Sequence, residues 1–174
     1  MRLFYALTFD TDTKTRITHY QKQLASHAIK GRLTRESNYH VTLEFIGEAT
    51  PTEKKTLTEV LYQLDQCPQS IRVDHFGVFS VKGRQLVWLG VQQQAELMAL
   101  QNRMRDRLND MGFYAERRQY TPHITLGRNM TLRDKVHSLK AEMAELPVYS
   151  LALMESKRVG DVLVYEAIEE VFPA

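Results

Sequence analysis

The chain has 174 residues, of which 43% are hydrophobic, enough to bury the core of one compact domain. Its 23 basic and 21 acidic residues leave a net charge of +2, too small to indicate a nucleic-acid binder by charge alone. The single cysteine excludes an internal disulfide, no apolar run approaches the ~20 residues that cross a bilayer, and the first residues lack a signal-peptide pattern. We therefore expect a soluble cytoplasmic protein without a membrane-spanning segment.

The first half of the chain alternates predicted strands and helices. Alternating apolar residues predict a strand over 2–9, and a helix should begin at 10–12. A second strand is expected over 38–46. The next helix should begin at Thr50, followed by a proline at the first helical position and by Glu53 as the capping-box partner.

A hairpin and a long helix follow in the middle of the chain. Strands are predicted over 71–79 and 86–91, with Lys82-Gly83 in the turn between them. Apolar residues at helical spacing predict a helix over 97–111, and Gly112 is a suitable left-handed stop.

The second half repeats this order of elements. We expect a short strand over 113–116, a strand over 122–128, a helix capped at 131–134, and a hairpin of 148–154 with 162–168. The repetition predicts an internal duplication within a single domain. Its fold class should be α+β, with two pseudo-symmetric lobes of antiparallel sheet and flanking helices over residues 1–174.

Each half also carries the pattern His, aliphatic, Thr, Leu. The two copies, residues 40–43 and 123–126, are separated by 123 − 40 = 83 residues. On a strand the His and Thr side chains leave one face and the aliphatic side chains leave the other. One such tetrapeptide most often holds a structural histidine, but two at equivalent places indicate a duplicated catalytic element.

Two imidazoles suit phosphodiester chemistry without a metal. Imidazole titrates near neutral pH, so one ring can accept a proton while the other donates one. His40 and His123 could therefore activate water and protonate the departing oxygen. The hydroxyls of Thr42 and Thr125 could donate hydrogen bonds to the phosphate oxygens, where charge gathers in the transition state.

Other chemistries have weaker support in the sequence. Zinc motifs such as His-Glu-x-x-His and Cys-x-x-Cys are absent. The one carboxylate within the motifs is Glu44, which strand parity places on the His40 face, where it would either assist His40 or be solvated. Cys67 has no nearby histidine in the sequence, which disfavours a covalent mechanism.

Arginines gather near both motifs. Arg32 and Arg35 precede the first, while Arg117, Arg118 and Arg128 surround the second. They would form either a basic rim for a phosphate-bearing ligand or an ordinary solvated surface.

The chain resembles the two-histidine phosphoesterase superfamily and, within it, the bacterial RNA 2′,3′-cyclic phosphodiesterases, also called 2′-5′ RNA ligases. Residues 2–7, 38–47, 86–91 and 122–128 carry the resemblance. It implies a bilobal α+β fold with an active-site cleft between the lobes. It also implies hydrolysis of a terminal RNA 2′,3′-cyclic phosphate to a 2′-phosphate, and ATP-independent, reversible joining of RNA ends through a 2′-5′ bond.

The same resemblance suggests roles for the motif residues. His40 would donate a proton to the leaving 3′-oxygen, and His123 would accept the proton of the attacking water. Thr42 and Thr125 would bind the phosphate oxygens.

Two further residues match family positions near the cleft. Arg128 would bind phosphate or stack on the terminal base. Phe45 is opposite in parity to His40 and would point into the core of an ideal strand, so it could approach the base only at a strand end or a bulge.

The implied partner is RNA with a 2′,3′-cyclic phosphate end, such as tRNA halves, or cyclic nucleotides, and no cofactor, metal, membrane or obligate protein partner is expected. Two alternatives stay open from the residues alone. One is the same chemistry on small cyclic nucleotides or an ADP-ribose cyclic phosphate. The other is a non-catalytic nucleotide-binding module, although binding alone does not need a matched acid and base.

Overall fold

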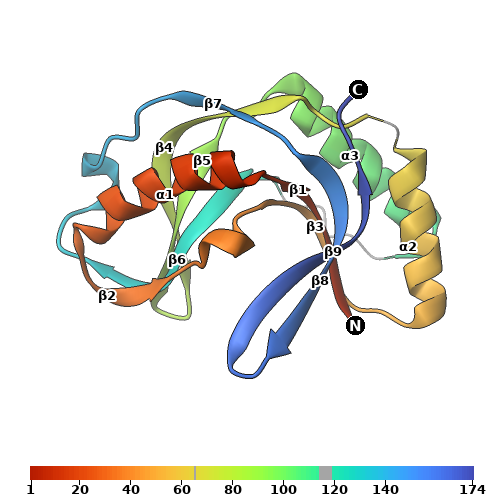
Figure 1. The fold of residues 1–174 in the computed structure, drawn as a ribbon, viewed down its shortest axis with the longest axis horizontal. Helices are drawn as coiled ribbons and strands as arrows, with labels where there is room; N and C mark the ends of the chain where they lie inside the picture. The colour runs from red at the N-terminus through yellow and green to blue at the C-terminus, as the bar shows by residue number, and fades with distance from the viewer. Residues whose placement is uncertain (65, 114–118) are drawn as a thin grey trace.

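The computed structural model describes residues 1–64, 66–113 and 119–174. Within these ranges the strands form two antiparallel sheets (Figure 1). The first sheet has the order β3 (Val41–Glu48), β1 (Arg2–Thr8), β8 (Ser150–Val159), β9 (Val162–Val171). The second has the order β2 (Ala28–Leu33), β6 (His123–Leu132), β5 (Arg84–Val91), β4 (Ser70–Val81), β7 (Ala144–Pro147).

Each sheet combines strands from both halves of the chain. In the first sheet, β1 and β3 pair with β8 and β9 from the far end of the sequence, and Figure 1 shows the β8–β9 hairpin projecting beyond the rest of the ribbon. The two lobes are therefore not the two successive halves of the chain. The internal duplication within a single domain stays a prediction.

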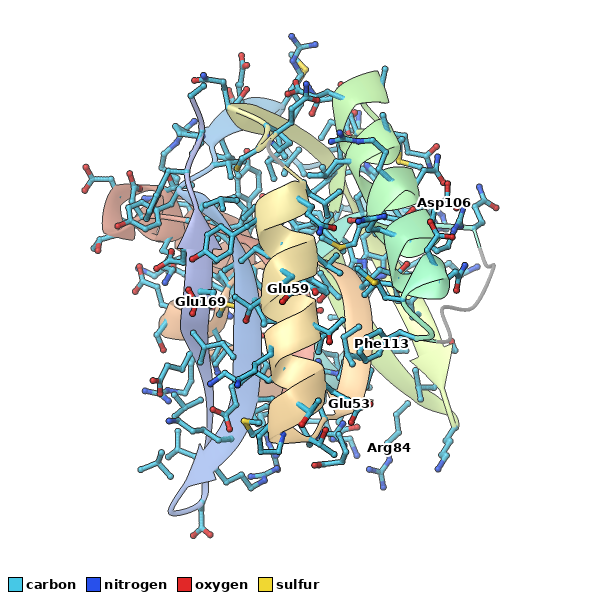
Figure 2. The ribbon with its side chains drawn as sticks, turned by 90° about the vertical axis from the view of Figure 1, so that its right-hand side faces the viewer. Glu53, Glu59, Arg84, Asp106, Phe113 and Glu169 are labelled. Carbon is cyan, nitrogen blue, oxygen red and sulfur yellow. The ribbon has the colours of Figure 1, made fainter. Side chains whose placement is uncertain are left out.

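A helix does not always pack on the sheet whose strand precedes it. α1 (Thr11–Ala25) follows β1 of the first sheet but packs on the second, whereas α2 (Pro51–Gln63) and α3 (Ala95–Asp110) pack on the first (Figures 1 and 2). Buried aliphatic side chains such as Ile17, Leu61 and Leu100 fill the space between helices and sheets. None of the helices within the described ranges is long and apolar enough to cross a bilayer.

Several local predictions are confirmed. Thr50 caps α2, with the Thr50 hydroxyl accepting from the Glu53 amide and the Glu53 carboxylate accepting from the Thr50 amide. Lys82 and Gly83 both adopt positive φ values, 52° and 75°, in the β4–β5 turn, and Gly112 follows α3 with φ of 87°.

The helix predicted to begin at 131–134 is wrong. β6 continues to Leu132, which pairs with Ala28 of β2, and only the 3-10 turn Val136–Ser138 follows. Strand β2 has little buried surface and no clear alternation, so the sequence did not reveal the partner that keeps β6 extended. The strand predicted over 113–116 falls largely on residues 114–116, outside the described ranges.

Candidate active site

A β-bulge in β3 turns Phe45 onto the same face as Thr42. Thr42 pairs with Ala6 and Phe45 pairs with Phe4, while the pairing of β3 with β1 skips Leu43. Ala6 and Phe4 share a face of β1, so Thr42 and Phe45 share the corresponding face of β3. The bulge that the sequence analysis required for Phe45 is thus present, and 54% of the Phe45 side chain is exposed.

The same bulge changes the position expected for Glu44. Glu44 pairs with Tyr5, whose side chain is buried in the core on the face away from the cleft. The Gln101 amide of α3 donates to a Glu44 carboxylate oxygen at 2.8 Å. The prediction that Glu44 shares the His40 face is therefore wrong, because the extra residue of a bulge shifts the alternation of side chains between the two faces of the strand.

Strand β6 contains a second bulge at the equivalent place. Thr125 pairs with Trp88 and Gly127 with Val87, so the pairing of β6 with β5 skips Leu126. Arg128 follows Thr125 by three residues, as Phe45 follows Thr42. Because a bulge lies between the two residues of each pair, Arg128 and Phe45 both line the same cavity as His40 and His123.

Side chains from elsewhere in the fold bind the carbonyls of these irregular segments. The Tyr120 hydroxyl donates to the Thr42 carbonyl at 2.8 Å, and the Gln21 amide donates to the Leu126 carbonyl at 3.0 Å. Burial raises the pKa of Tyr120, which keeps its hydroxyl protonated as a donor. These bonds satisfy backbone groups at the two bulges and fix their shape.

The two histidines are oriented in the same way. His40 Nδ1–H donates to the Asn38 carbonyl at 2.8 Å, and His123 Nδ1–H donates to the Thr121 carbonyl at 2.7 Å. A carbonyl only accepts, so each Nδ1 carries the proton and each neutral ring has an unprotonated Nε2. Thr42 Oγ1 lies 2.9 Å from His40 Nε2 and donates to it in this state.

Aromatic rings surround both imidazoles. The rings of Phe4 and Tyr165 each lie 5.1 Å from the His40 ring. His123 lies 5.0 Å from Phe79 and 5.6 Å from Trp88. This packing holds the rings in place and removes water from around them.

Burial lowers the pKa of His40 to about 4, and it also lowers the pKa of His123. The nearby Arg128 cation adds to the lowering of the pKa at both histidines, although less than burial does. Near neutral pH both rings are thus uncharged in the free protein. Either one can accept a proton, and a bound anion is needed before one of them can donate.

The predicted site residues meet in one cleft. A cavity of about 550 Å³ is lined by all six: His40, His123, Thr42, Thr125, Phe45 and Arg128. A second cavity of about 410 Å³ adjoins it and shares His40, Thr125 and Arg128. Arg117 and Arg118, which the sequence also placed near the second motif, lie outside the described residues.

The contacts that hold the β8–β9 hairpin beside His40 were not predicted from the sequence. The buried Asn38 side chain donates to the Leu163 carbonyl at 2.9 Å and accepts from the Tyr165 amide at 3.3 Å. Asn38 therefore binds β9 with its side chain and His40 with its backbone carbonyl. These partners are more than 120 residues apart, with separations of 125 and 127, and no local pattern signals the contact.

The described residues contain no group of three or more His, Cys, Asp or Glu side chains placed to hold a metal ion. Cys67 is buried, and burial raises its pKa to about 12, so that it stays a thiol at neutral pH. The side chains that line the cleft include imidazoles, hydroxyls and guanidinium groups.

Comparison with known proteins decides the family. A sequence model of the 2′-5′ RNA ligase superfamily matches residues 9–160. The chain belongs to this superfamily. The chain is also 28% identical, over 98% of its length and 99% of the relative's, to an RNA 2′,3′-cyclic phosphodiesterase of Methanocaldococcus jannaschii. It is 30% identical to the Escherichia coli K12 enzyme of that name, over 74% of this chain and 72% of the relative.

Solved structures of other proteins have the same fold. TT0787 of Thermus thermophilus has a TM-score of 0.83 at 21% identity, covering 99% of this chain and 97% of that one. E. coli LigT in its apo form has a TM-score of 0.78 at 24% identity, covering 99% and 96%. The family, the α+β fold class and the enzyme class, a phosphodiesterase among the hydrolases, are thereby confirmed.

Proposed function

We propose that this protein hydrolyses the terminal 2′,3′-cyclic phosphate of RNA to a 2′-phosphate by acid-base catalysis between two histidines, without a metal or another cofactor. The proposal rests above all on one observation: two imidazoles, each fixed by an Nδ1–H bond to the carbonyl two residues earlier, line one cleft with two threonines. The names of the curated relatives, RNA 2′,3′-cyclic phosphodiesterases, support the substrate. E. coli LigT has been solved in complex with 3′-AMP and with phosphate, which supports a nucleotide-sized site.

In the proposed reaction, a water oxygen attacks phosphorus opposite the 3′-oxygen. His123 Nε2 accepts a proton of that water as the new P–O bond forms. The bond from phosphorus to the 3′-oxygen breaks, and protonated His40 donates its Nε2 proton to that oxygen. The products are a 2′-phosphate and a free 3′-hydroxyl, and both histidines then exchange protons with solvent.

The environment of His40 supports its role as the donor. A lowered pKa makes the His40 imidazolium a stronger acid than ordinary histidine, provided that the anionic cyclic phosphate first helps to protonate it. Protonation also reverses the bond to Thr42, because Nε2–H then donates to the Thr42 hydroxyl oxygen. The hydroxyl hydrogen becomes free to bind a phosphate oxygen, and Thr125 would bind another.

Phe45 and Arg128 would bind the rest of the terminal nucleotide. The Arg2 guanidinium carbon lies 5.3 Å from the Phe45 ring centroid and covers one face of the ring, so a base would stack on the other. Arg128 would bind phosphate oxygens or the free face of the base. With the 5′-hydroxyl of a second RNA in the place of water, the same groups would join RNA ends such as tRNA halves in the cytoplasm: the 5′-oxygen bonds to phosphorus, the bond to the 3′-oxygen breaks, and a 2′-5′ linkage and a 3′-hydroxyl result.

The decisive experiment uses RNA ending in a 2′,3′-cyclic phosphate, in buffer with EDTA, and identifies the product as 2′-phosphate or 3′-phosphate by phosphorus NMR. We expect the 2′-phosphate, and a loss in kcat of about 10²- to 10⁴-fold for His40→Ala or His123→Ala. His137→Ala, at an exposed histidine in the 3-10 turn, serves as the control.

Three outcomes would contradict the proposal: unchanged substrate, activity that EDTA abolishes, or activity that survives in the double histidine variant. Tight binding of a nucleoside monophosphate without turnover would instead indicate a non-catalytic module. Equal kcat/KM for mononucleotide and oligonucleotide substrates would favour a small cyclic nucleotide.

A further inference from the structure

Four arginines surround the second cavity of the cleft, which we name the arginine groove. They come from three separate segments of the chain and are all exposed: Arg32, Arg35, Arg128 and Arg158. The groove adjoins one of the two histidines directly, since His40 and Thr125 belong to its wall. Phe45 lies in the other cavity and not in this one.

These positive charges are not neutralised within the protein. In the part of the chain that the structure describes, none of the four guanidinium groups forms an ion pair with a carboxylate. Arg158 Nη1 donates to the backbone carbonyl of Asp161 at 3.3 Å, and the Asp161 side chain is the acidic group in the groove wall. An excess of positive charge therefore remains at this end of the cleft.

Two of the arginines face each other across strands. Arg32 of β2 and Arg128 of β6 are direct partners in the ladder, so their side chains leave the same face. Like charges placed directly opposite destabilise a sheet. Such a pair is expected where a ligand supplies the missing negative charge.

The neighbouring cavity shares Arg128 and Arg158 with the groove, and its two other cations have partners within the protein. Lys157 pairs with Glu166, and Arg2 lies over the Phe45 ring.

We propose that the arginine groove binds the internucleotide phosphates immediately 5′ to the terminal cyclic phosphate, and so selects RNA over mononucleotides. This inference rests on the proposed function and adds the part of the substrate that the histidines do not touch. With the cyclic phosphate between the histidines and the terminal base on Phe45, the preceding nucleotide extends into the groove. Guanidinium groups suit this task because they bind phosphate oxygens in pairs of hydrogen bonds.

The test compares three substrates with the same terminal nucleotide: a nucleoside 2′,3′-cyclic phosphate, the dinucleotide with that end, and the dinucleotide with an uncharged methylphosphonate linkage. For the wild type we expect kcat/KM to rise about tenfold or more from the first to the second, as a charged hydrogen bond contributes about 1.5–3 kcal/mol. The methylphosphonate should lose most of that gain, and the gain should shrink as salt increases.

Arg32→Gln and Arg35→Gln, at the two arginines that line the groove and not the other cavity, should abolish most of the gain. They should leave kcat/KM for the mononucleotide near the wild-type value, which also shows that the variants fold. Arg103→Gln, at an exposed arginine of α3 that lines neither cavity, also removes one positive charge and should behave as the wild type.

Four other kinds of outcome would contradict the inference. A gain that persists with the methylphosphonate would show that the second base is recognised and not its phosphate. A gain that persists in both arginine variants would overturn the role of the groove while the proposed function stands. A gain that is absent in the wild type, with the cyclic phosphates still hydrolysed, would overturn the role of the groove and favour a small cyclic nucleotide as the substrate. Failure of the wild type to hydrolyse any cyclic phosphate would overturn both.

Discussion

Phe45 and Arg128 occupy the same position in two equivalent bulged strands. Each follows a site threonine by three residues, and in each strand the ladder skips the residue directly after that threonine. The same kind of β-bulge thus places different side chains in the cleft: an aromatic ring from the first sheet and a guanidinium group from the second. In the proposed complex the terminal base would stack on Phe45, and Arg128 would bind phosphate or the other face of that base.

Removing the aromatic ring should weaken substrate binding. Stacking on an aromatic side chain contributes about 1–3 kcal/mol per base, so Phe45→Ala should lower kcat/KM by about 5- to 150-fold, measured with a dinucleotide cyclic phosphate. Phe172→Ala is the matched control, because Phe172 is similarly exposed, 58% against 54%, but lies near the C-terminus. Equal losses in the two variants would show that Phe45 acts through general stability.

Removing the charge of Arg128 should move the pH profile of kcat/KM upward. Arg128 lowers the pKa of His40 and of His123 because a cation disfavours a second positive charge nearby. Arg128→Gln should therefore raise both pKa values and shift both limbs of the profile to higher pH. Arg128→Lys keeps the charge and should keep the wild-type profile; an equal shift in both variants would contradict this electrostatic role.

The free energy of unfolding should fall as the pH drops from about 6.5 to about 4. In this window the unfolded chain protonates His40 while the folded protein, in which the His40 pKa is about 4, does not. The effect is absent above pH 6.5 and amounts to about 3 kcal/mol below pH 4. Urea denaturation across this range should show a shallower pH dependence for His40→Gln, and an unchanged one for His137→Gln. The same slope in His40→Gln as in the wild type would contradict burial of a neutral His40.

The hydroxyl of Tyr120 should matter for both stability and activity. Tyr120→Phe leaves the Thr42 carbonyl without this donor at the bulge, so we expect a loss of about 1 kcal/mol in stability and a lower kcat. Tyr62→Phe is the control, since its hydroxyl binds Glu169 on the surface at 2.6 Å and should contribute less. Equal losses in thermal denaturation of the two variants would argue against a special role for the Tyr120 bond.

Gly77 should be intolerant of even a methyl group. A Cβ at Gly77 would overlap the ring of Trp88, which is 7% exposed and packs against His123. Gly77→Ala should therefore cost about 1–3 kcal/mol and reduce activity by displacing Trp88. Gly90→Ala would meet His75, whose side chain is 53% exposed and can turn away, so its loss of stability should be smaller. Equal losses of stability would contradict this distinction.

Local signals were sufficient for elements whose ends are determined by neighbouring residues. The capping box at Thr50 and the positive φ turn at Lys82-Gly83 involve groups within a few residues of one another, so the sequence could specify them. Strand β2 and the extended end of β6 depend on each other instead. Their pairing joins segments about 100 residues apart, and the helix predicted near Thr131 was wrong because local propensity yields to such pairing.

The sequence by itself determined which groups are available for chemistry: two His-x-Thr motifs, whose histidine and threonine share a face because alternate residues of a strand do. Only the tertiary structure decided which other side chains join them. Each bulge reverses the parity beyond its threonine, so that Phe45 enters the cleft and Glu44 leaves it for Gln101. A one-residue skip in a ladder is a property of two paired strands, and neither strand's own sequence contains it.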